Sequence, residues 1–212
     1  MRFSELFETP TYQATELPIS DFEINIISKD TLDRDYDLLG ELRDNVLEHT
    51  IGAIKKDKTL AIIGPVKKRR DGKISVEIHS EIKFHARPEL GNASAGNDLA
   101  ENAIQVDTVL SIESQKGRGN AYKLYKMLLN HGYTVVSDNI QYVGGRKLWE
   151  KILRQSFLEN HNVFILQNGR YLRDANGAPL VYDGVNISAD DIWSTDKKSE
   201  PHYYTLLVAK NI

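Results

Sequence analysis

The sequence predicts an α/β fold, with a central mixed sheet of about six to seven strands flanked by helices. Three observations predict it. Several short runs alternate apolar and polar residues, as half-buried strands do. Three longer stretches place their apolar residues on one helical face. Strands and helices alternate along the middle of the chain, after an antiparallel hairpin, which indicates that parallel and antiparallel pairs share one sheet.

The elements follow one another over a single predicted domain at residues 21–212, after an arm at residues 1–20. From about residue 168 this domain carries an elaborated C-terminal region. The predicted elements are, in order, a strand at 22–27, a helix at 33–49, a hairpin of strands at 59–66 and 73–84, a loop at 87–102, a strand at 104–112, a helix at 120–131, a strand at 134–137, a helix at 144–156, and strands at 163–166 and 203–208. Asn176-Gly177 is a predicted turn, and a short helix is expected after Ser188.

Composition narrows the function classes. The chain has 212 residues, a net charge of −3 and no cysteine, which excludes disulfides, thiolate metal sites and cysteine nucleophiles. The N-terminus does not resemble a signal peptide, and no apolar run is long enough for a membrane span, so a cytoplasmic protein is expected. The basic run Lys67 to Arg70 precedes the turn dipeptide Asp71-Gly72. A solvated hairpin tip is favoured there over a nucleic-acid patch.

The most informative segment is the loop Lys116-Gly117-Arg118-Gly119, which follows a predicted strand and opens a predicted helix. Glycines let a backbone approach a phosphate closely. The first amides of a helix lack internal partners, and the helix dipole favours an anion there. Lys116 and Arg118 add two positive charges to the loop. The segment therefore predicts an anion site, with a ligand-free strand-to-helix turn as the alternative.

This loop, continued by Asn120-Ala121 and Leu124-Tyr125, resembles the acyl-coenzyme A loop of the GNAT acyltransferase superfamily. Leu148-Trp149-Glu150-Lys151-Ile152 is similar to a later helix of that family. Residues 133–149 look like GNAT-like proteins of tailed bacteriophages. The resemblance covers about residues 104–155.

The resemblance implies a GNAT-like fold that binds acetyl-coenzyme A as co-substrate. The backbone of Leu110, Ser111 and Ile112 would pair with the pantetheine arm, and an amide near Leu110 or Ile112 would stabilise the oxyanion. The strand that begins at Thr134 would splay away to admit that arm. The pyrophosphate would be held by the loop residues Lys116, Gly117, Arg118, Gly119, Asn120 and Ala121.

The sequence departs from the family pattern at three points. Ser114 stands where the family has Gln or Arg, although Gln115 is adjacent, and the stretch before Gly117 is one residue shorter than the commonest form. Trp149 stands where the family has its general-acid tyrosine, and an indole N–H cannot usefully protonate a thiolate. The comparison therefore supports cofactor binding better than catalysis, and Trp149 is assigned to the core.

Three residues are catalytic candidates, each with a structural alternative. Asp107 lies in the strand expected to line the acceptor side and could accept the amine proton, or it could simply face solvent. Asp138 follows a buried strand, where it could be functional or cap a turn. Tyr142 could replace the missing acid, or it could pack on the surface. The six histidines show no metal-ligand spacing, so no metal is expected.

The leading hypothesis is an N-acyltransferase that moves an acetyl group from acetyl-coenzyme A directly to an amine in a ternary complex. The acceptor would be a small molecule or a protein, in the host cytoplasm if a phage encodes the chain. The rival is a catalytically silent GNAT-fold phage protein, either a virion component or a binder of a host protein. A nucleotide-phosphate binder is a third interpretation. Membrane and nucleic-acid partners are not expected, and a homo-oligomer is left open.

Overall fold

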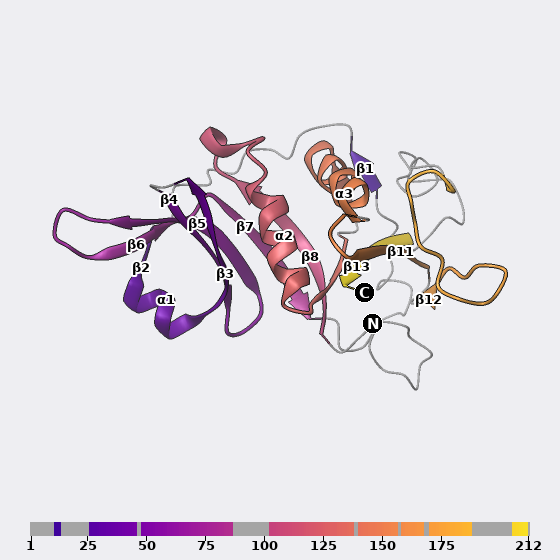
Figure 1. Cartoon of the computed structure of the whole chain (residues 1–212), viewed down its shortest axis with the longest axis horizontal. Helices are drawn as coiled ribbons and strands as arrows, with labels where there is room; N and C mark the ends of the chain where they lie inside the picture. The colour runs from indigo at the N-terminus through magenta and orange to yellow at the C-terminus, as the bar shows by residue number, and fades with distance from the viewer. Residues whose placement is uncertain are drawn as a thin grey trace. The chain divides into compact units, whose positions relative to one another are not determined.

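The computed structural model describes residues 11–13, 26–45, 48–86, 102–137, 140–156, 158–167, 170–187 and 205–211. The part of the chain described has an α+β fold with a mixed sheet and three α-helices (Figure 1). Its contacts divide the chain into two compact units. Unit 1 comprises residues 1–18, 86–105 and 132–212, and unit 2 comprises residues 19–85 and 106–131. The single domain expected from the sequence stays a prediction.

Unit 2 is built on strands that pair in the order β8–β7–β5–β4–β3, with β6 joining β5 to β2. The recorded pairs among β2 to β7 are all antiparallel. Its elements are β2 (Ile26–Ser28), α1 (Lys29–Asp35), β3 (Tyr36–Asn45), β4 (Glu48–Lys55), β5 (Leu60–Lys68), β6 (Ile74–Glu77), β7 (Ser80–Ala86), the later residues of β8 (Ala103–Ser111) and α2 (Asn120–Asn130).

The predicted helix at residues 33–49 is wrong. Helix α1 ends at Asp35, and the chain continues as the antiparallel strands β3 and β4. Leu38 is 51% exposed while Leu39 is 4% exposed, which is the alternation of a strand. The spacing of the leucines is compatible with the helical period and with the strand period, so the pairing with β4 decides between helix and strand. Gly40 in the middle of the segment also disfavours a helix, by about 1 kcal/mol relative to alanine.

Two strand glycines leave room for close neighbours inside unit 2, one beside helix α2 and one beside β6. A Cβ at Gly52 would lie 2.2 Å from the sulfur of Met127 on α2. A Cβ at Gly64 would lie 1.8 Å from the backbone oxygen of Glu77 on β6. Real Cβ atoms do not approach that closely, so Gly64 is required beside the backbone of Glu77, whereas at Gly52 the side chain of Met127 would have to move. Leu124 and Leu128 of α2 are fully buried, as its apolar stripe predicts.

Unit 1 contains parallel and antiparallel pairs. The first three residues of β8 pair parallel with β9 (Thr134–Val136), and β13 (Thr205–Asn211) lies antiparallel between β9 and β11 (His161–Gln167). Phe164 and Tyr171 share a buried cluster, with ring centroids 5.1 Å apart. The other elements are β1 (Thr11–Gln13), β10 (Ile140–Tyr142), which pairs parallel with β1, α3 (Val143–Ser156) and β12 (Arg170–Tyr171).

Several other predictions are confirmed. The hairpin forms across Asp71-Gly72, although its second arm is divided into β6 and β7. Gly177 closes its turn by donating to the carbonyl of Asp174 at 3.0 Å. The strands predicted before and after α2, both later helices and the last two predicted strands are present as β8, β9, α2, α3, β11 and β13. Apart from Thr11–Gln13 and Asn102, the predicted arm and the predicted loop at 87–102 lie outside the described residues, as does the helix expected after Ser188.

Candidate functional site

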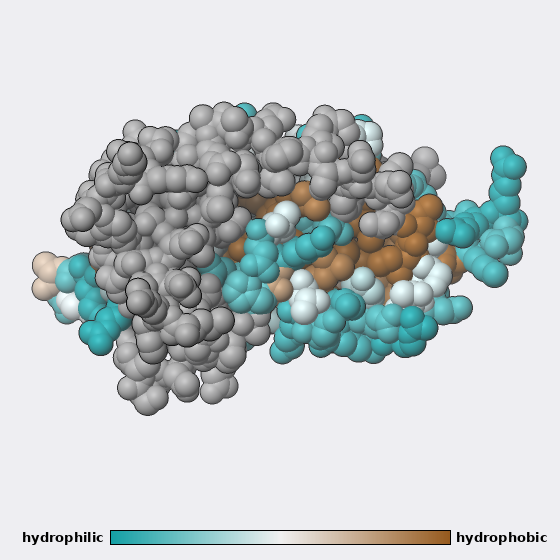
Figure 2. Space-filling model, turned by 180° about the vertical axis from the view of Figure 1, so that it is seen from behind, coloured by the Kyte–Doolittle hydropathy of each residue, from teal (hydrophilic) through white to brown (hydrophobic). Residues whose placement is uncertain are grey.

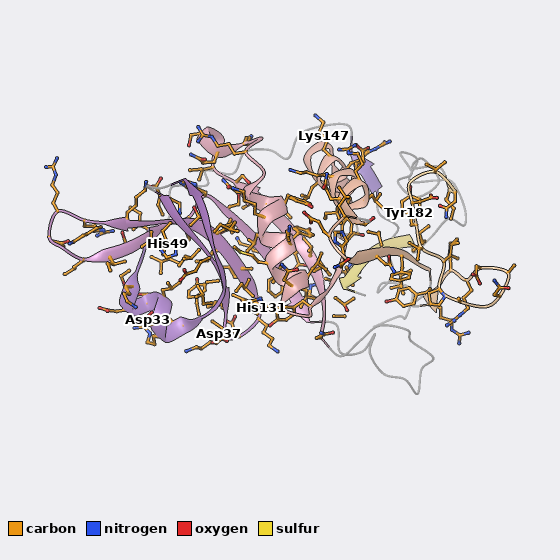
Figure 3. All side chains as sticks on the ribbon, viewed as in Figure 1. Asp33, Asp37, His49, His131, Lys147 and Tyr182 are labelled. Atoms are coloured by element: carbon orange, nitrogen blue, oxygen red, sulfur yellow. The ribbon has the colours of Figure 1, made fainter. Side chains whose placement is uncertain are left out.

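The candidate site is the connection between β8 and α2, which lies wholly in unit 2. After Ser111, one 3-10 turn at Glu113–Gln115 leads into the glycine loop. Gly117 has φ 77°, and Gly119, the N-cap of α2, has φ 77° and ψ 17°. These left-handed conformations cost an L-residue about 1–2 kcal/mol, which explains both glycines. His131 marks the other end of α2 (Figure 3).

The backbone amides of this loop divide into two groups. Some are engaged: Gln115 N–H donates to Ile112 O at 2.9 Å, and Arg118 N–H donates to Gln115 O at 3.2 Å. Within the described ranges, no acceptor is recorded for the N–H groups of Gly117, Gly119, Asn120 and Ala121. Four amide donors therefore remain around the first turn of α2, where the helix dipole also favours an anion.

Helix α1 shows the alternative arrangement. Its N-cap, Ser28, accepts a hydrogen bond from Thr31 N–H through its side chain at 3.2 Å. Gly119 offers no side chain for this purpose, and α2 has no side-chain cap. Substituting an N-cap side chain by alanine typically costs about 1 kcal/mol, so the sequence forgoes a stabilising cap at α2. An anionic ligand would supply the acceptors that α2 lacks.

Side chains add donors and charge to the loop. Lys116 and Arg118 are exposed. Asn120 is 9% exposed, and its Nδ2 atom is buried with no hydrogen-bond partner among the residues described. A buried amide donor without an acceptor is uncommon in a folded protein. The loop can therefore bind an anion chemically, through backbone amides first and cationic side chains second.

The residues expected to pair with pantetheine lie just before the loop. Leu110 and Ser111 end β8, and Ile112 follows it. The Ser111 hydroxyl lies 2.6 Å from the Ser80 hydroxyl. Ile112 is buried, and its N–H donates to the carbonyl of His79 at 3.0 Å, so that amide is already engaged. The expected oxyanion donor near Leu110 stays a prediction.

The structure adds a partner for Asp107 that the sequence did not identify. His85 Nδ1 lies 2.8 Å from Asp107 Oδ1, and both side chains are about half exposed. The two residues lie on β7 and β8, which are neighbouring strands of unit 2. Asp107 thus lies on β8, and the glycine loop follows the end of this same strand.

The structure says less about the other two catalytic candidates, Asp138 and Tyr142. Asp138 lies outside the described residues. Tyr142 ends β10 in unit 1, and the description of this strand covers its backbone only. Trp149 of α3 is 1% exposed, which confirms its assignment to the core. Within unit 2, the described geometry brings Asp107 together with His85.

The described ranges also bear on metal binding and on membrane crossing. No group of three His, Cys, Asp or Glu side chains there is arranged to hold a metal ion. No helix among those residues is long and apolar enough to cross a membrane. No protein-family model, curated protein or solved structure matches this chain. The resemblance of the loop to GNAT acyltransferases therefore rests only on the sequence motifs given above.

Proposed function

We propose that this chain is an acyl-coenzyme A-dependent N-acyltransferase whose glycine loop binds the pyrophosphate of acetyl-coenzyme A. The observation that carries the proposal is the uncapped N-terminus of α2. It combines two left-handed glycines with four amide donors for which no acceptor is recorded in the described part of the chain. A pyrophosphate supplies several acceptor oxygens and negative charge to such a cradle.

The edge of β8 supports the pantetheine part of the proposal. In the sheet, β8 lies between β9 and β7, and residues 106–111 are the part of β8 that belongs to unit 2. The recorded pairing of β8 with β9 ends at Gln105–Val136, before Leu110 is reached. An extended amide-containing chain can add to the edge of a strand by backbone hydrogen bonds. A pantetheine arm beside Leu110 and Ser111 would lead directly to the glycine loop.

The reaction would be a direct transfer. The acceptor amine attacks the thioester carbonyl, and the tetrahedral intermediate collapses with departure of the coenzyme A thiolate. Asp107, with His85 bonded to it, would take the proton from the amine. Asp138 and Tyr142, the other two candidates from the sequence, stay predictions for proton transfer. The setting proposed for this reaction is the cytoplasm.

The first experiment measures binding. Isothermal titration calorimetry with acetyl-coenzyme A is expected to give saturable heat for the wild type and a loss of affinity of tenfold or more for Gly117→Val. Gly72→Val is the matched control, because Gly72 has φ 81° and Gly117 has φ 77°, and a Cβ meets no atom within 4 Å at either position. The backbone strain is therefore similar, but only Gly117 faces the proposed ligand.

Three outcomes separate the proposals. No heat at millimolar acetyl-coenzyme A would overturn the cofactor claim. Equal competition by ATP and by 3′-phosphorylated adenosine nucleotides would favour the general nucleotide-phosphate binder. Tight binding without release of free thiol across a panel of amines would favour the rival of a catalytically silent protein that acts by binding a partner. Thiol release with one class of amine supports the transferase and names the acceptor class.

A further inference from the structure

The hairpin of β5 and β6 carries a concentration of positive charge that the proposed acyl transfer does not use. Residues 67–73 contain five cationic side chains and one carboxylate, in a chain whose net charge is −3. Lys67, Lys68, Arg69, Arg70 and Lys73 are all exposed. From the sequence alone, this run is expected to be a solvated turn. The structure shows how its charges are arranged.

Most of these cations have no carboxylate partner. Among the residues described, Lys68, Arg69, Arg70 and Lys73 form no ion pair. Arg69 makes one side-chain contact, from Nε to the hydroxyl of Ser75 at 3.4 Å. Three other cations of unit 2 lie beside a carboxylate, in the pairs Lys29–Asp33, Arg34–Asp35 and Lys55–Asp57. The hairpin therefore keeps a positive charge that neighbouring side chains do not neutralise.

The one carboxylate of the tip is held by the backbone. Asp71 Oδ1 accepts a hydrogen bond from Lys73 N–H at 3.0 Å. Backbone bonds close the same turn, from Gly72 N–H to Arg69 O at 3.0 Å and from Arg69 N–H to Lys73 O at 2.8 Å. The turn is thus ordered by its own backbone, with Asp71 engaged in it. Among the residues described, no bond that closes the turn involves the side chains of Lys68, Arg70 or Lys73.

The base of the hairpin is anchored. Ser75 and Val76 of β6 are buried, and β6 is paired on both sides, with β5 and with β2. Lys68 pairs with Ile74 at the last recorded pair of the ladder, so the turn lies beyond the paired strands. Figure 1 shows the hairpin reaching past β2, and Figure 2 shows its end as a hydrophilic projection. The turn of a hairpin whose base is fixed on both sides therefore presents the cations.

We propose that this hairpin is a docking arm for the phosphate backbone of double-stranded nucleic acid. A two-stranded ribbon fits the major groove of B-form DNA, which is about 12 Å wide. Lysine and arginine side chains without protein partners can take phosphates as theirs, with release of the counterions. The turn residues 69–73 contain no apolar side chain, so the tip lacks the anchors by which peptides enter a lipid interface.

The affinity should have the size and salt dependence of a small electrostatic contact. With about four phosphates neutralised, the slope of log K against log salt is expected near −3.6. Binding would then weaken by about a hundredfold between 50 and 200 mM salt. The dissociation constant should fall in the range of about 10⁻⁴ to 10⁻⁶ M that is typical of sequence-independent binding. Because no base is read, the sequence of the duplex should have little effect.

The test uses the full chain and a fluorescein-labelled duplex of about 20 base pairs, followed by fluorescence anisotropy at several salt concentrations. The triple variant Lys68→Gln, Arg69→Gln, Arg70→Gln is expected to lose tenfold or more in affinity, with a shallower salt slope. The control triple Lys29→Gln, Arg34→Gln, Lys55→Gln removes the same charge from unit 2 and should change affinity less than twofold. Arg70→Glu alone, at a side chain with no recorded bond in the described chain, gives a second readout if the triple variant melts early.

Several results would overturn the docking arm. One is an unchanged anisotropy of the labelled duplex when the wild-type protein is added to about 100 μM at low salt. Equal losses in the two triple variants would assign binding to net charge rather than to the hairpin. The same variants are also tested by sedimentation with vesicles of phosphatidylserine and phosphatidylcholine. Hairpin-dependent binding to vesicles without binding to duplex would identify a membrane contact in place of nucleic acid.

Discussion

The Nδ1 atom of His85 on β7 lies 2.8 Å from the Oδ1 atom of Asp107 on β8. This contact leaves the second ring nitrogen of His85 for another partner, and no other bond to His85 is recorded in the described chain. A carboxylate bonded to one imidazole nitrogen fixes the ring's orientation and tautomer. The pair is thus suited to accept a proton from a substrate bound beside β8.

Replacing Asp107 by Asn should therefore reduce acyl transfer while leaving cofactor binding unchanged. A positioned general base contributes about 10²–10⁴-fold to a rate. We expect Asp107→Asn and His85→Gln each to lower kcat by about a hundredfold, and the double variant to lower it no further, because both act on one proton. Acetyl-coenzyme A affinity, measured by calorimetry, should stay within twofold.

The pair of His49 and Glu41 provides a matched control. Its atoms are also 2.8 Å apart, and its side chains are similarly exposed, but it lies on β3 and β4. Glu41→Gln and His49→Gln should leave kcat unchanged. If they lower kcat as much as the changes at Asp107 and His85, the effect is one on general stability, and the assigned role of Asp107 is wrong.

Two strand glycines give a prediction about packing. Gly64→Ala should destabilise unit 2 more than Gly52→Ala. At Gly64 the new Cβ meets the backbone oxygen of Glu77, whereas at Gly52 it meets the side chain of Met127, which can move. Overpacking of this kind costs about 1–3 kcal/mol, and the backbone clash should exceed that range. Urea unfolding of both variants measures the difference.

A double variant identifies the cause. Adding Met127→Ala should recover part of the loss in Gly52→Ala and none of the loss in Gly64→Ala, because only the first clash involves that side chain. Equal recovery in both backgrounds would show that Met127 acts through general core volume.

The sequence predicts much of the region around the candidate site. Helix α2 is recognisable because its apolar stripe repeats at the helical period and Gly132 follows it, with φ 79°. The β5–β6 turn is recognisable from Asp71-Gly72. These are local signals, in which the residues that determine the structure are adjacent in the chain. The glycine loop belongs to this class.

The features that the sequence did not predict depend on contacts between residues far apart in the chain. The spacing of Leu38, Leu39 and Leu42 is compatible with a helix and with a strand. The segment forms a strand because it pairs with β4. The bond between His85 and Asp107 joins residues 22 positions apart, so it requires the register of β7 against β8. Neither the pairing partner nor the register can be read from local composition.

Trp149 should prove to be a structural residue. It is 1% exposed on α3 of unit 1, so truncation to alanine removes a large buried side chain. We expect Trp149→Ala to cost about 3–5 kcal/mol of unfolding free energy. Trp149→Phe should cost less, since it retains much of the buried ring. Neither variant should change acetyl-coenzyme A affinity under conditions where it is folded, and a large change would give Trp149 a place in the cofactor site.

The turn between β4 and β5 should make stability depend on pH in a defined direction. The carboxylate of Asp57 lies 2.8 Å from Lys55 Nζ and accepts hydrogen bonds from the hydroxyl and the N–H of Thr59 at 2.6 and 3.1 Å. The bond from Lys55, followed by those from Thr59, lowers the pKa of Asp57 from its ordinary value. The charged form is thus favoured in the folded state.

A carboxyl group with a lowered folded pKa stabilises the protein above its unfolded pKa, about 3.9 for aspartate, and loses that contribution as pH falls through the folded pKa. Asp57→Asn should therefore lower the urea midpoint at pH 7, and its difference from wild type should shrink as the pH is lowered below about 4. The measurement is urea unfolding of both proteins between pH 7 and pH 2.5. A difference that stays constant over this range would mean that Asp57 acts through the shape of its side chain, because an uncharged contribution does not titrate.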